Sequence, residues 1–274
     1  MGPGEGAVLM TPEARLCSVE EILPMRELYR EEMNCQITHD SISRREGWVR
    51  PYLLMLRGDA MGYGLVAIAG PWTGKPTVVE YHVAPEARTR AFDLFEAFVA
   101  ASAAQFIEIQ SNATLLTVML HLWSPNVVSE SIVFHDRITT SLPSNGAVLR
   151  SVTSVEESLQ CVERLRGSSE WLLELDGKTV ATGGIAFHYN RPYGDIYMAV
   201  DESYRQRGLG SYLVQELKRV CYEELGSVPC ARCSPANTAS RKTLQKAGFV
   251  PCAHILTGSI ALPAMTTLSD RASV

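Results

Sequence analysis

The sequence has no excess of basic residues and no long apolar run. Its 274 residues include 25 Lys and Arg against 30 Asp and Glu, for a net charge of −5, so it lacks the basic balance typical of nucleic-acid binding. No apolar stretch approaches the roughly 20 residues of a membrane span. The N-terminus, MGPGEGAVLM, is unlike a secretory signal. We therefore expect no nucleic-acid or membrane partner, and a cytoplasmic location.

Several signatures of catalysis and cofactor binding are also absent. There is no G-x-S-x-G elbow for a nucleophilic serine and no Gly-Lys-Ser/Thr of a P-loop. The seven cysteines are odd in number and irregularly spaced, which favours reduced thiols. Cys230 and Cys233 form a C-x-x-C, but a second pair of ligands at zinc spacing is missing. We expect ordinary thiols there and no metal.

The stretch from Tyr193 to Leu225 carries the clearest pattern. Residues 193–200, YGDIYMAV, have the composition of a strand, and residues 211–225 show the apolar spacing of a helix. Between them, Gly208 and Gly210 lie where the helix opens. Helix N-termini have unpaired N–H groups and a partial positive charge, and glycines leave them accessible. The pattern predicts a phosphate or pyrophosphate site.

A dinucleotide-binding fold is a poor match for this loop. Such a fold needs G-x-G-x-x-G directly after its strand, whereas Leu213 stands at the third glycine position and Val200 to Gly208 is a long excursion. The stretch instead resembles the acyl-CoA loop of the GNAT acetyltransferase superfamily, Arg/Gln-x-x-Gly-x-Gly/Ala after a strand ending near Val. Arg205, Gly208 and Gly210 match that loop, and Val200 matches the strand end.

The family's second signature, Asn-x-x-Ala/Ser followed by a helix and Gly-Phe, is also present. It reads here as Asn237, Ser240, Gly248 and Phe249. The resemblance implies that acetyl-CoA is the cosubstrate and that the strand ending at Val200 splays from its neighbour. The cofactor-binding residues that it implies are Met198, Ala199, Val200, Arg205, Gln206, Arg207, Gly208, Leu209, Gly210, Ser211, Asn237 and Ser240. Asn237 is equally suited to cap its helix.

The two halves of the chain share a layout. Gly177 corresponds to Gly58 in two similar strand pairs, and VDESYRQRGLGSY from Val200 lines up with VAPEARTRAFDLF from Val83. Ordered matches of this kind indicate an internal duplication. With Pro143 to Gly146 as a turn-forming boundary, we expect two tandem GNAT-like domains, 1–143 and 147–274. Each is an α/β (α+β) domain with a mixed, mostly antiparallel twisted sheet flanked by helices.

The copies differ at the loop. In this alignment Ala91 stands at the position of Gly208 and Asp93 at that of Gly210. A carboxylate there would repel a phosphate, so we expect a degenerate first half and an acetyl-CoA-binding second half. Mycothiol synthase is similar in having two such halves.

The resemblance implies direct attack of an amine on the acetyl thioester, with no covalent enzyme intermediate. The family often carries a tyrosine acid where this chain has Leu244, so Tyr197, Tyr204 and Tyr212 are the alternative candidates. Its usual carboxylate base falls near Gly194.

The candidates for the base are Asp195, which alternates with Ile196 and so faces away from the core, and His188 or Tyr189 near a strand end. A water chain is a further alternative.

We therefore expect an N-acetyltransferase that acts on a primary amine of a small molecule, as a monomer or homodimer. Asp195, His188 and Tyr197 are the catalytic candidates. An acyl-CoA-binding sensor or a pseudoenzyme module without turnover is the alternative, because the usual tyrosine is missing.

Overall fold

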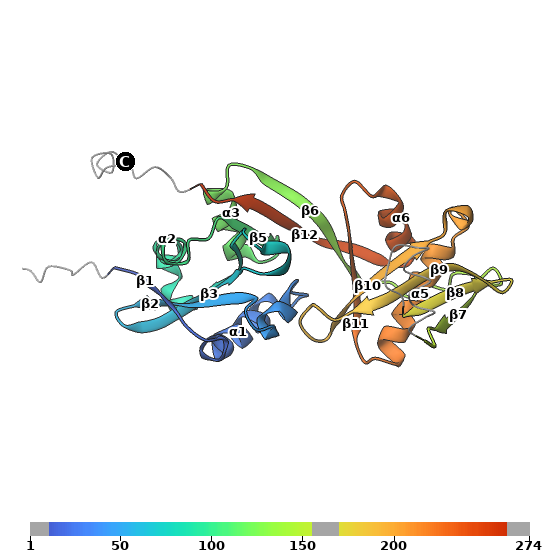
Figure 1. Cartoon of the computed structure of the whole chain (residues 1–274), viewed down its shortest axis with the longest axis horizontal. Coiled ribbons are helices and arrows are strands. Elements are labelled where there is room, and N and C mark those ends of the chain that lie inside the picture. The colour runs from blue at the N-terminus through green and yellow to red at the C-terminus, as the bar shows by residue number, and fades with distance from the viewer. Residues whose placement is uncertain (1–10, 155–169, 262–274) are drawn as a thin grey trace, which may run out of the picture. The chain divides into compact units, whose positions relative to one another are not determined.

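The computed structural model of the chain describes residues 11–154 and 170–261. These residues form two compact units (Figure 1). Of the described residues, the first unit comprises 11–35, 42–128 and 256–261, and the second comprises 36–41, 129–154 and 170–255. No helix of the described residues is long and apolar enough to cross a membrane.

The first unit is a sheet with helices. Its strands follow the order β1-β2-β3-β4-β5, with β12 next to β5. All the pairs from β1 to β4 are antiparallel, and β4 runs parallel to β5. The elements are β1 Glu13–Leu16, α1 Val19–Met33, β2 Val49–Leu56, β3 Asp59–Ala67, β4 Thr77–Val83, α2 Ala91–Ser102, β5 Phe106–Gln110 and α3 Thr114–Trp123.

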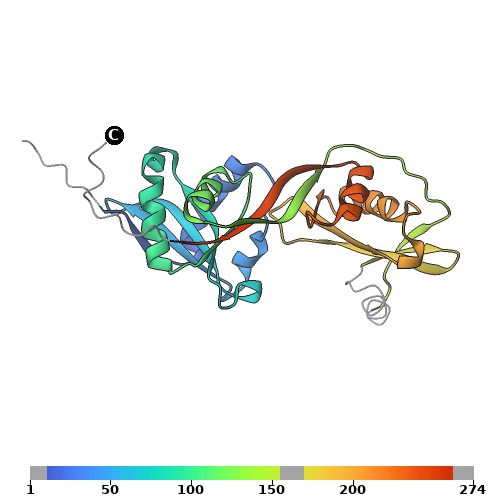
Figure 2. The same cartoon turned by 90° about the horizontal axis from the view of Figure 1, so that it is seen from above.

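The second unit repeats this arrangement. Its order is β7-β8-β9-β10-β11, with β6 next to β11, and β10–β11 is again the parallel pair. Helices α5 and α6 lie together on one face of the sheet (Figure 2). The elements are β6 Val127–Asp136, β7 Val148–Ser151, β8 Trp171–Leu175, β9 Lys178–Ala186, β10 Tyr193–Val200, α5 Leu209–Glu223, β11 Val228–Cys233, α6 Thr238–Lys246 and β12 Phe249–Ser259. The expected class, tandem domains with mixed sheets and flanking helices, is confirmed.

The compact units divide the chain differently from the expected single cut between 143 and 147. β6 follows α3 in the first half, but its residues 132–135 pair with 230–233 of β11, so it belongs mainly to the second unit. The chain after Ile255 belongs to the first unit, where the N–H of Ile260 donates to the carbonyl of Gln105 at 2.8 Å. Backbone pairing, which sequence periodicity does not specify, sets this division.

The hairpins explain the shared layout of the halves. The β2–β3 turn has Arg57 and Gly58 at φ 57° and 85°, and the β8–β9 turn has Asp176 and Gly177 at φ 51° and 72°. Positive φ at both central residues is the geometry of tight hairpin turns that match strand twist. Each hairpin then leads into the long third strand of its unit.

Helix α1 begins earlier than its proline suggests. Proline is best tolerated in the first turn of a helix, whereas α1 starts at Val19 and has Pro24 in its second turn. The cause is a capping box at Ser18: its hydroxyl accepts from the N–H of Glu21 at 3.3 Å, and the Glu21 carboxylate accepts from the N–H of Ser18 at 2.8 Å. These bonds satisfy N-terminal donors and start the helix.

A buried ion pair joins three segments of the second unit. The Lys218 ammonium on α5 lies 2.6 Å from Asp136 Oδ1 at the end of β6, and it donates to the carbonyls of Ile138 and Ala247 at 2.9 and 2.8 Å. A Cβ on Gly248 would stand 2.1 Å from the Ile138 oxygen, and Gly248 has φ +92°. The glycine of the Gly-Phe signature is therefore required by close backbone approach.

We predict that Lys218→Met lowers the free energy of unfolding by about 3–5 kcal/mol, because it leaves the Asp136 carboxylate buried without its cation. Urea denaturation measures the loss. Lys178→Met, at the exposed start of β9, is the control and should change stability by less than about 0.5 kcal/mol. Equal stability of the two variants would show that the buried pair does not hold these segments together.

Candidate functional site

The two parallel strands of the second unit separate before either of them ends. Their ladder pairs Tyr193–Ile196 with Val228–Ala231 and stops there, although β10 continues to Val200 and β11 to Cys233. β10 remains paired with β9 as far as Val200. We call this opening beyond the Ile196–Ala231 pair the fork. It is the splay that the sequence resemblance implied.

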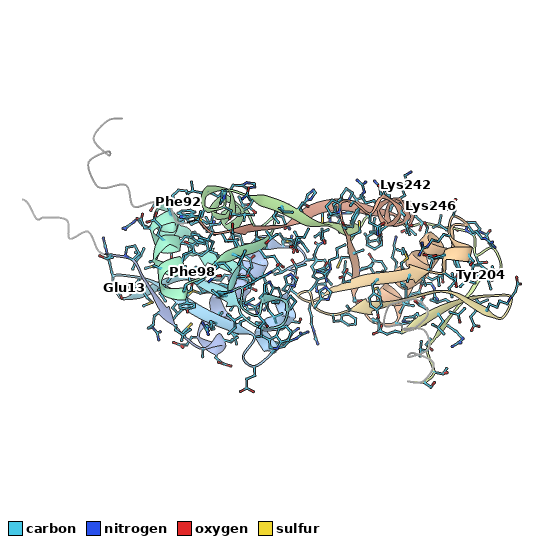
Figure 3. All side chains as sticks on the ribbon, turned by 45° about the horizontal axis from the view of Figure 1, so that its top comes forward. Glu13, Phe92, Phe98, Tyr204, Lys242 and Lys246 are labelled. Atoms are coloured by element: carbon cyan, nitrogen blue, oxygen red, sulfur yellow. The ribbon has the colours of Figure 1, made fainter. Side chains whose placement is uncertain are left out.

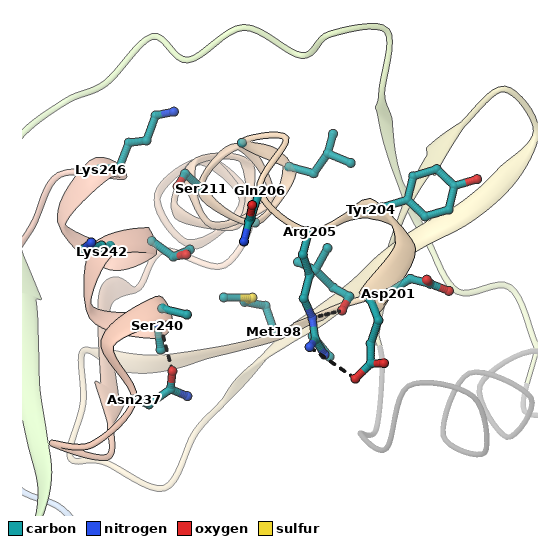
Figure 4. Close-up of a pocket in the computed structure, with 18 of the residues that line it drawn as sticks. Met198, Asp201, Tyr204, Arg205, Gln206, Ser211, Asn237, Ser240, Lys242 and Lys246 are labelled. Carbon is teal, nitrogen blue, oxygen red and sulfur yellow. Dashed lines mark hydrogen bonds and ion pairs between the residues drawn. The ribbon is translucent and has the colours of Figure 1, made fainter.

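The side chains of β10 alternate between the two faces of the sheet. Ile196, Met198 and Val200 belong to the hydrophobic core under α5. Met198 lies in the middle of the opening between α6 and the loop that follows β10 (Figure 4). The fork is therefore lined on this side by an apolar side chain of β10.

The loop before α5 holds its main chain in a conformation suited to anions. Gln206 and Gly208 have positive φ values of 63° and 81°, and Gly208 is the N-cap of α5. Successive residues of this kind turn neighbouring N–H groups toward a common point, forming an anion-binding nest. A left-handed glutamine is uncommon, and such strain gathers at functional sites. We call the N–H groups of residues 206–211 the phosphate nest.

Gly210 is needed for packing as well as for access. A Cβ there would lie 3.2 Å from Val200 Cγ2 and 3.4 Å from Thr243 Cγ2. The first turn of α5 is thus seated closely between β10 and α6. At Gly208 a Cβ would meet only the Lys246 ammonium, at 3.6 Å, so its positive φ is the main reason for glycine there.

Asn237 closes the opposite side of the site. It is the N-cap of α6, and its side-chain oxygen accepts from the Ser240 N–H at 2.9 Å (Figure 4). The capping role is thus present, and the side-chain amide nitrogen remains available as a donor toward the cavity that Asn237 lines.

A cavity of about 1430 Å³ joins the fork, the phosphate nest and α6. Eleven of the twelve predicted cofactor-binding residues line it: Met198, Ala199, Val200, Arg205, Gln206, Gly208, Leu209, Gly210, Ser211, Asn237 and Ser240. Arg207 does not. Its guanidinium lies over the Tyr204 ring, 5.1 Å from the ring centroid, and donates to the Ser203 carbonyl at 3.2 Å.

Arg205 also has a structural task. Its Nε donates to the Val200 carbonyl at 3.2 Å, and its guanidinium pairs with Glu202 at 3.3 Å (Figure 4). The arginine of the loop signature thereby fixes the end of β10. Sequence reasoning missed Lys242, Thr243 and Lys246 of α6, which line the cavity too. The signal for them was the i, i+4 spacing of the lysines on the helix that follows Asn237.

Comparison with known proteins agrees with this geometry. Residues 140–249 match the Acetyltransferase (GNAT) family. The chain carries a GNAT acetyltransferase domain. No protein with a curated description matches it. The family match supports acyl transfer as the general chemistry, and members of the family generally use acetyl-CoA.

Solved structures extend the likeness to both units. An acetyltransferase of the GNAT family from Colwellia psychrerythraea is 12% identical, with 91% of this chain and 100% of that chain covered and a TM-score of 0.70. A GCN5-related N-acetyltransferase from Sphaerobacter thermophilus is 16% identical, with 93% and 97% covered and a TM-score of 0.61. A tandem GNAT protein from the clavulanic acid biosynthesis pathway is 12% identical, with 92% and 100% covered and a TM-score of 0.58. At these identities the likeness establishes a shared tandem fold.

The face of the GNAT sheet away from α5 carries the carboxylate candidate. Asp195 is 5% exposed, and its Oδ2 lies 2.9 Å from His188 Nε2 and 3.1 Å from Arg232 Nε. Asp195 turns away from the core under α5, as expected. Its side chain is nevertheless buried, because His188 and Arg232 cover it. Two candidate bases that the sequence suggested separately therefore lie side by side, with 2.9 Å between His188 Nε2 and Asp195 Oδ2. A side chain at Gly194, the family's usual position for the base, would collide with Ile185 at 2.7 Å.

The tyrosine candidates lie in different places. The Tyr197 hydroxyl stands over Gly184 of β9, on the same face of β10 as Asp195. Tyr204 is among the residues that line the cavity, and its ring points away from Met198 (Figure 4). Burial and, next, the Glu216 carboxylate raise the pKa of Tyr212.

Tyr189, the other strand-end candidate for the base, is buried. Burial and then the Asp195 carboxylate raise the pKa of Tyr189 well above its usual value. Leu244 is a buried core residue and offers no acid.

The C-x-x-C thiols are packing residues. Cys230 and Cys233 are buried, and burial raises the pKa of both. The Cys230 thiol donates to the Gly194 carbonyl at 3.2 Å. Among the described residues, no group of His, Cys, Asp and Glu is arranged to hold a metal.

The loop of the first unit, residues 84–90, differs from the phosphate nest of the second unit. The cause is not a carboxylate at the position of Gly210, as the sequence suggested. In both units an arginine Nε donates to the carbonyl that ends the fourth strand, β4 or β10: Arg88 to Val83 at 3.1 Å and Arg205 to Val200 at 3.2 Å. These arginines are 117 positions apart (205 − 88 = 117).

Inside the helices the spacing is larger. A Cβ on Gly64 would meet Phe98 of α2, and a Cβ on Gly183 would meet Leu217 of α5. Gly64 therefore corresponds to Gly183, and Phe98 to Leu217. In each case the residue of the second unit comes 119 positions later (183 − 64 = 119 and 217 − 98 = 119). The first unit therefore has two fewer residues before its helix. Ala91, not Asp93, occupies the position of Gly210, and Asp93 instead pairs with Arg90 at 2.6 Å on the surface.

Aromatic side chains fill the matching space in the first unit. Tyr81, at the position of Met198, is buried and donates to the Ala91 carbonyl at 2.5 Å. Its ring packs against Phe95 with centroids 5.0 Å apart, and Phe95 packs against Trp123 of α3 at 5.1 Å. Between residues 84 and 90 no residue has a positive φ. The first unit thus lacks both the phosphate nest and the room beside it.

Proposed function

We propose that this protein transfers the acetyl group of acetyl-CoA to a primary amine of a small molecule, using the cavity of the second unit. The observation that carries the proposal is the continuity of the phosphate nest at α5 with the fork between β10 and β11. A diphosphate held by the nest directs the rest of the ligand toward Met198 and Asn237. A cavity of about 1430 Å³ exceeds the volume usual for small ligands and suits one the size of a nucleotide thioester.

For direct transfer the protein must position the two reactants, accept a proton from the amine and stabilise the oxyanion. The fork performs the first task, since it exposes the β11-facing edge of β10 from Met198 onward to the pantetheine arm. Main-chain groups of Met198 and Val200 hold that arm, and the Asn237 amide donates to it. The acetyl carbonyl then lies at the fork, where β10 main-chain donors stabilise negative charge.

His188 and Asp195 together serve as the proton acceptor. We assign the imidazole proton of His188 to Nε2, which lies 2.9 Å from Asp195 Oδ2, and this leaves Nδ1 as the basic atom. Asp195 orients the ring, and His188 takes the proton of the attacking amine directly or through water. Tyr197, two residues along the same face of β10, is our candidate for protonating the departing thiolate. A small primary amine is the acceptor class, and the reaction takes place in a monomer or homodimer.

We predict that one acetyl-CoA binds per chain and that Gly210→Asp abolishes binding. The packing of Val200 and Thr243 around Gly210 forces a new carboxylate toward the cavity, where it opposes an anionic ligand. Like unit charges at about 4 Å cost about 4 kcal/mol at an effective dielectric of about 20, roughly a thousandfold in affinity. Isothermal titration calorimetry measures both stoichiometry and affinity.

The matched control for this experiment is Gly226→Asp. It adds the same charge beyond the other end of α5, where a Cβ has open space and a positive φ of 57° suits aspartate. It should bind acetyl-CoA as the native chain does. Two equivalent sites on the native chain, or normal binding by Gly210→Asp, would contradict the assignment of the second unit as the donor site.

We predict that His188→Gln and Asp195→Asn lower kcat by about 10²- to 10⁴-fold, the usual contribution of general acid–base catalysis, with acetyl-CoA affinity kept. Release of free CoA thiol is followed across a panel of primary amines, and the amine with the fastest release is used for the variants. Tyr197→Phe should also slow the chemical step, whereas Tyr204→Phe and Tyr212→Phe are controls that should not.

Full turnover in all of these variants would remove Asp195, His188 and Tyr197 from the mechanism. If the native chain binds acetyl-CoA but releases no thiol with any amine, the protein is an acyl-CoA sensor and the transfer reaction is refuted. Because the buried Leu244 stands where the family often carries its tyrosine acid, this assay decides between acetyl transfer and acyl-CoA binding without turnover.

A further inference from the structure

Helix α6 presents two lysines, one turn apart, to the cavity. Lys242 and Lys246 are spaced i, i+4 on α6 (Figure 3). Both line the cavity (Figure 4). Both are exposed. Neither forms an ion pair with an acid within 4.0 Å among residues 11–154 and 170–261. The two ammonium groups are therefore not neutralised by carboxylates of the described chain.

This arrangement is unfavourable without an anion. Like charges at i, i+4 on a helix destabilise it by about 0.2–0.5 kcal/mol. Lys246, in the last turn, offsets part of this through the negative end of the helix dipole. Lys242 lies in the middle of α6 and has no such compensation. A bound anion would relieve the repulsion.

The other cations near the loop are already engaged. Arg205 bonds the Val200 carbonyl and Glu202, and Arg207 lies over Tyr204 outside the cavity. The Lys246 ammonium, by contrast, lies 3.6 Å from the position of a Cβ on Gly208, beside the phosphate nest. Lys246 thus lies beside the nest, and Lys242 lines the same cavity one helical turn away.

The charge of the donor exceeds what the nest neutralises. The nest and the α5 dipole, worth about +0.5 charge, face a diphosphate. CoA carries in addition a phosphate monoester on its ribose, with a charge of about −1.5 to −2 at neutral pH. The two positive charges of Lys242 and Lys246 are opposite in sign to the charge of this third phosphate and similar to it in magnitude.

We infer that Lys242 and Lys246 bind the ribose 3′-phosphate of the acyl donor and make the protein select CoA over dephospho-CoA. The inference rests on the proposed function and deepens it, since it assigns donor specificity to residues whose type neither signature of the family specifies. The nest holds the diphosphate that both donors share, and the lysine pair recognises the group that only CoA has.

The test compares CoA with dephospho-CoA by calorimetry on the native chain and on the double variant Lys242→Gln with Lys246→Gln. Two partly exposed charge pairs of about 0.2–1 kcal/mol each predict that the native chain prefers CoA by about twofold to thirtyfold. In the double variant this preference falls to about onefold, while affinity for dephospho-CoA changes by less than about twofold. Lys178→Gln removes an exposed cation of the same unit that does not line the cavity, and it should keep the native preference.

Three outcomes would overturn the inference. Equal affinity of the native chain for both donors would show that the 3′-phosphate is not recognised. A double variant that loses both donors equally would assign the lysines to the diphosphate. A double variant that keeps the native preference would exclude them from recognition. Failure of the native chain to bind either donor refutes the proposed function itself, so the two failures are distinct. Thermal melting of each variant confirms that it is folded.

Discussion

The early end of the β10–β11 ladder is the constraint on which the second unit depends. Parallel strands that stayed paired to their ends would leave no opening between Met198 and α6. The separation after Ile196 and Ala231 needs support on both sides. β9 continues to hold β10, and the Arg232–Asp195 ion pair links the two strands just before the fork. On the helix side, Gly210 lets the first turn of α5 approach β10 closely, which places the phosphate nest at the end of the opening.

The two units show how small the difference between an open and a filled site is. Both have the same strand order, the same tight hairpin turns and the same arginine-to-carbonyl bond at the end of the fourth strand. In the first unit the loop is two residues shorter, and Tyr81, Phe95 and Trp123 occupy the space beside its helix. Loop length decides whether N–H groups converge on an anion, and side-chain volume decides whether a ligand has room. Neither change disturbs the packing that defines the fold.

The sequence predicted the parts of this molecule that local rules determine. Hairpin turns at Gly58 and Gly177, the strand–loop–helix from Tyr193 and the cap at Asn237 follow from residue type and spacing. Pairing across the chain does not. The sequence gives no local sign that β6 joins β11, or that His188 meets Asp195 across the end of a hairpin. The alignment of Asp93 with Gly210 was wrong because a two-residue difference in loop length is invisible when only the arginines are matched. Lys242 and Lys246 were missed because they lie on the helix of the second signature at positions whose residue type that signature does not specify.

Under the proposed function, the alternation of β10 separates the two reactants. Met198 and Val200 face α5 and the donor cavity, whereas Asp195 and Tyr197 face the other side of the same strand. Within a paired sheet such faces do not communicate, because side chains and ladder hydrogen bonds fill the space between them. At the fork the ladder is interrupted, so a thioester held on the α5 side becomes accessible to an amine held on the other. Donor binding and proton transfer are therefore coupled through one strand, and the position of the fork along β10 sets where acyl transfer can occur.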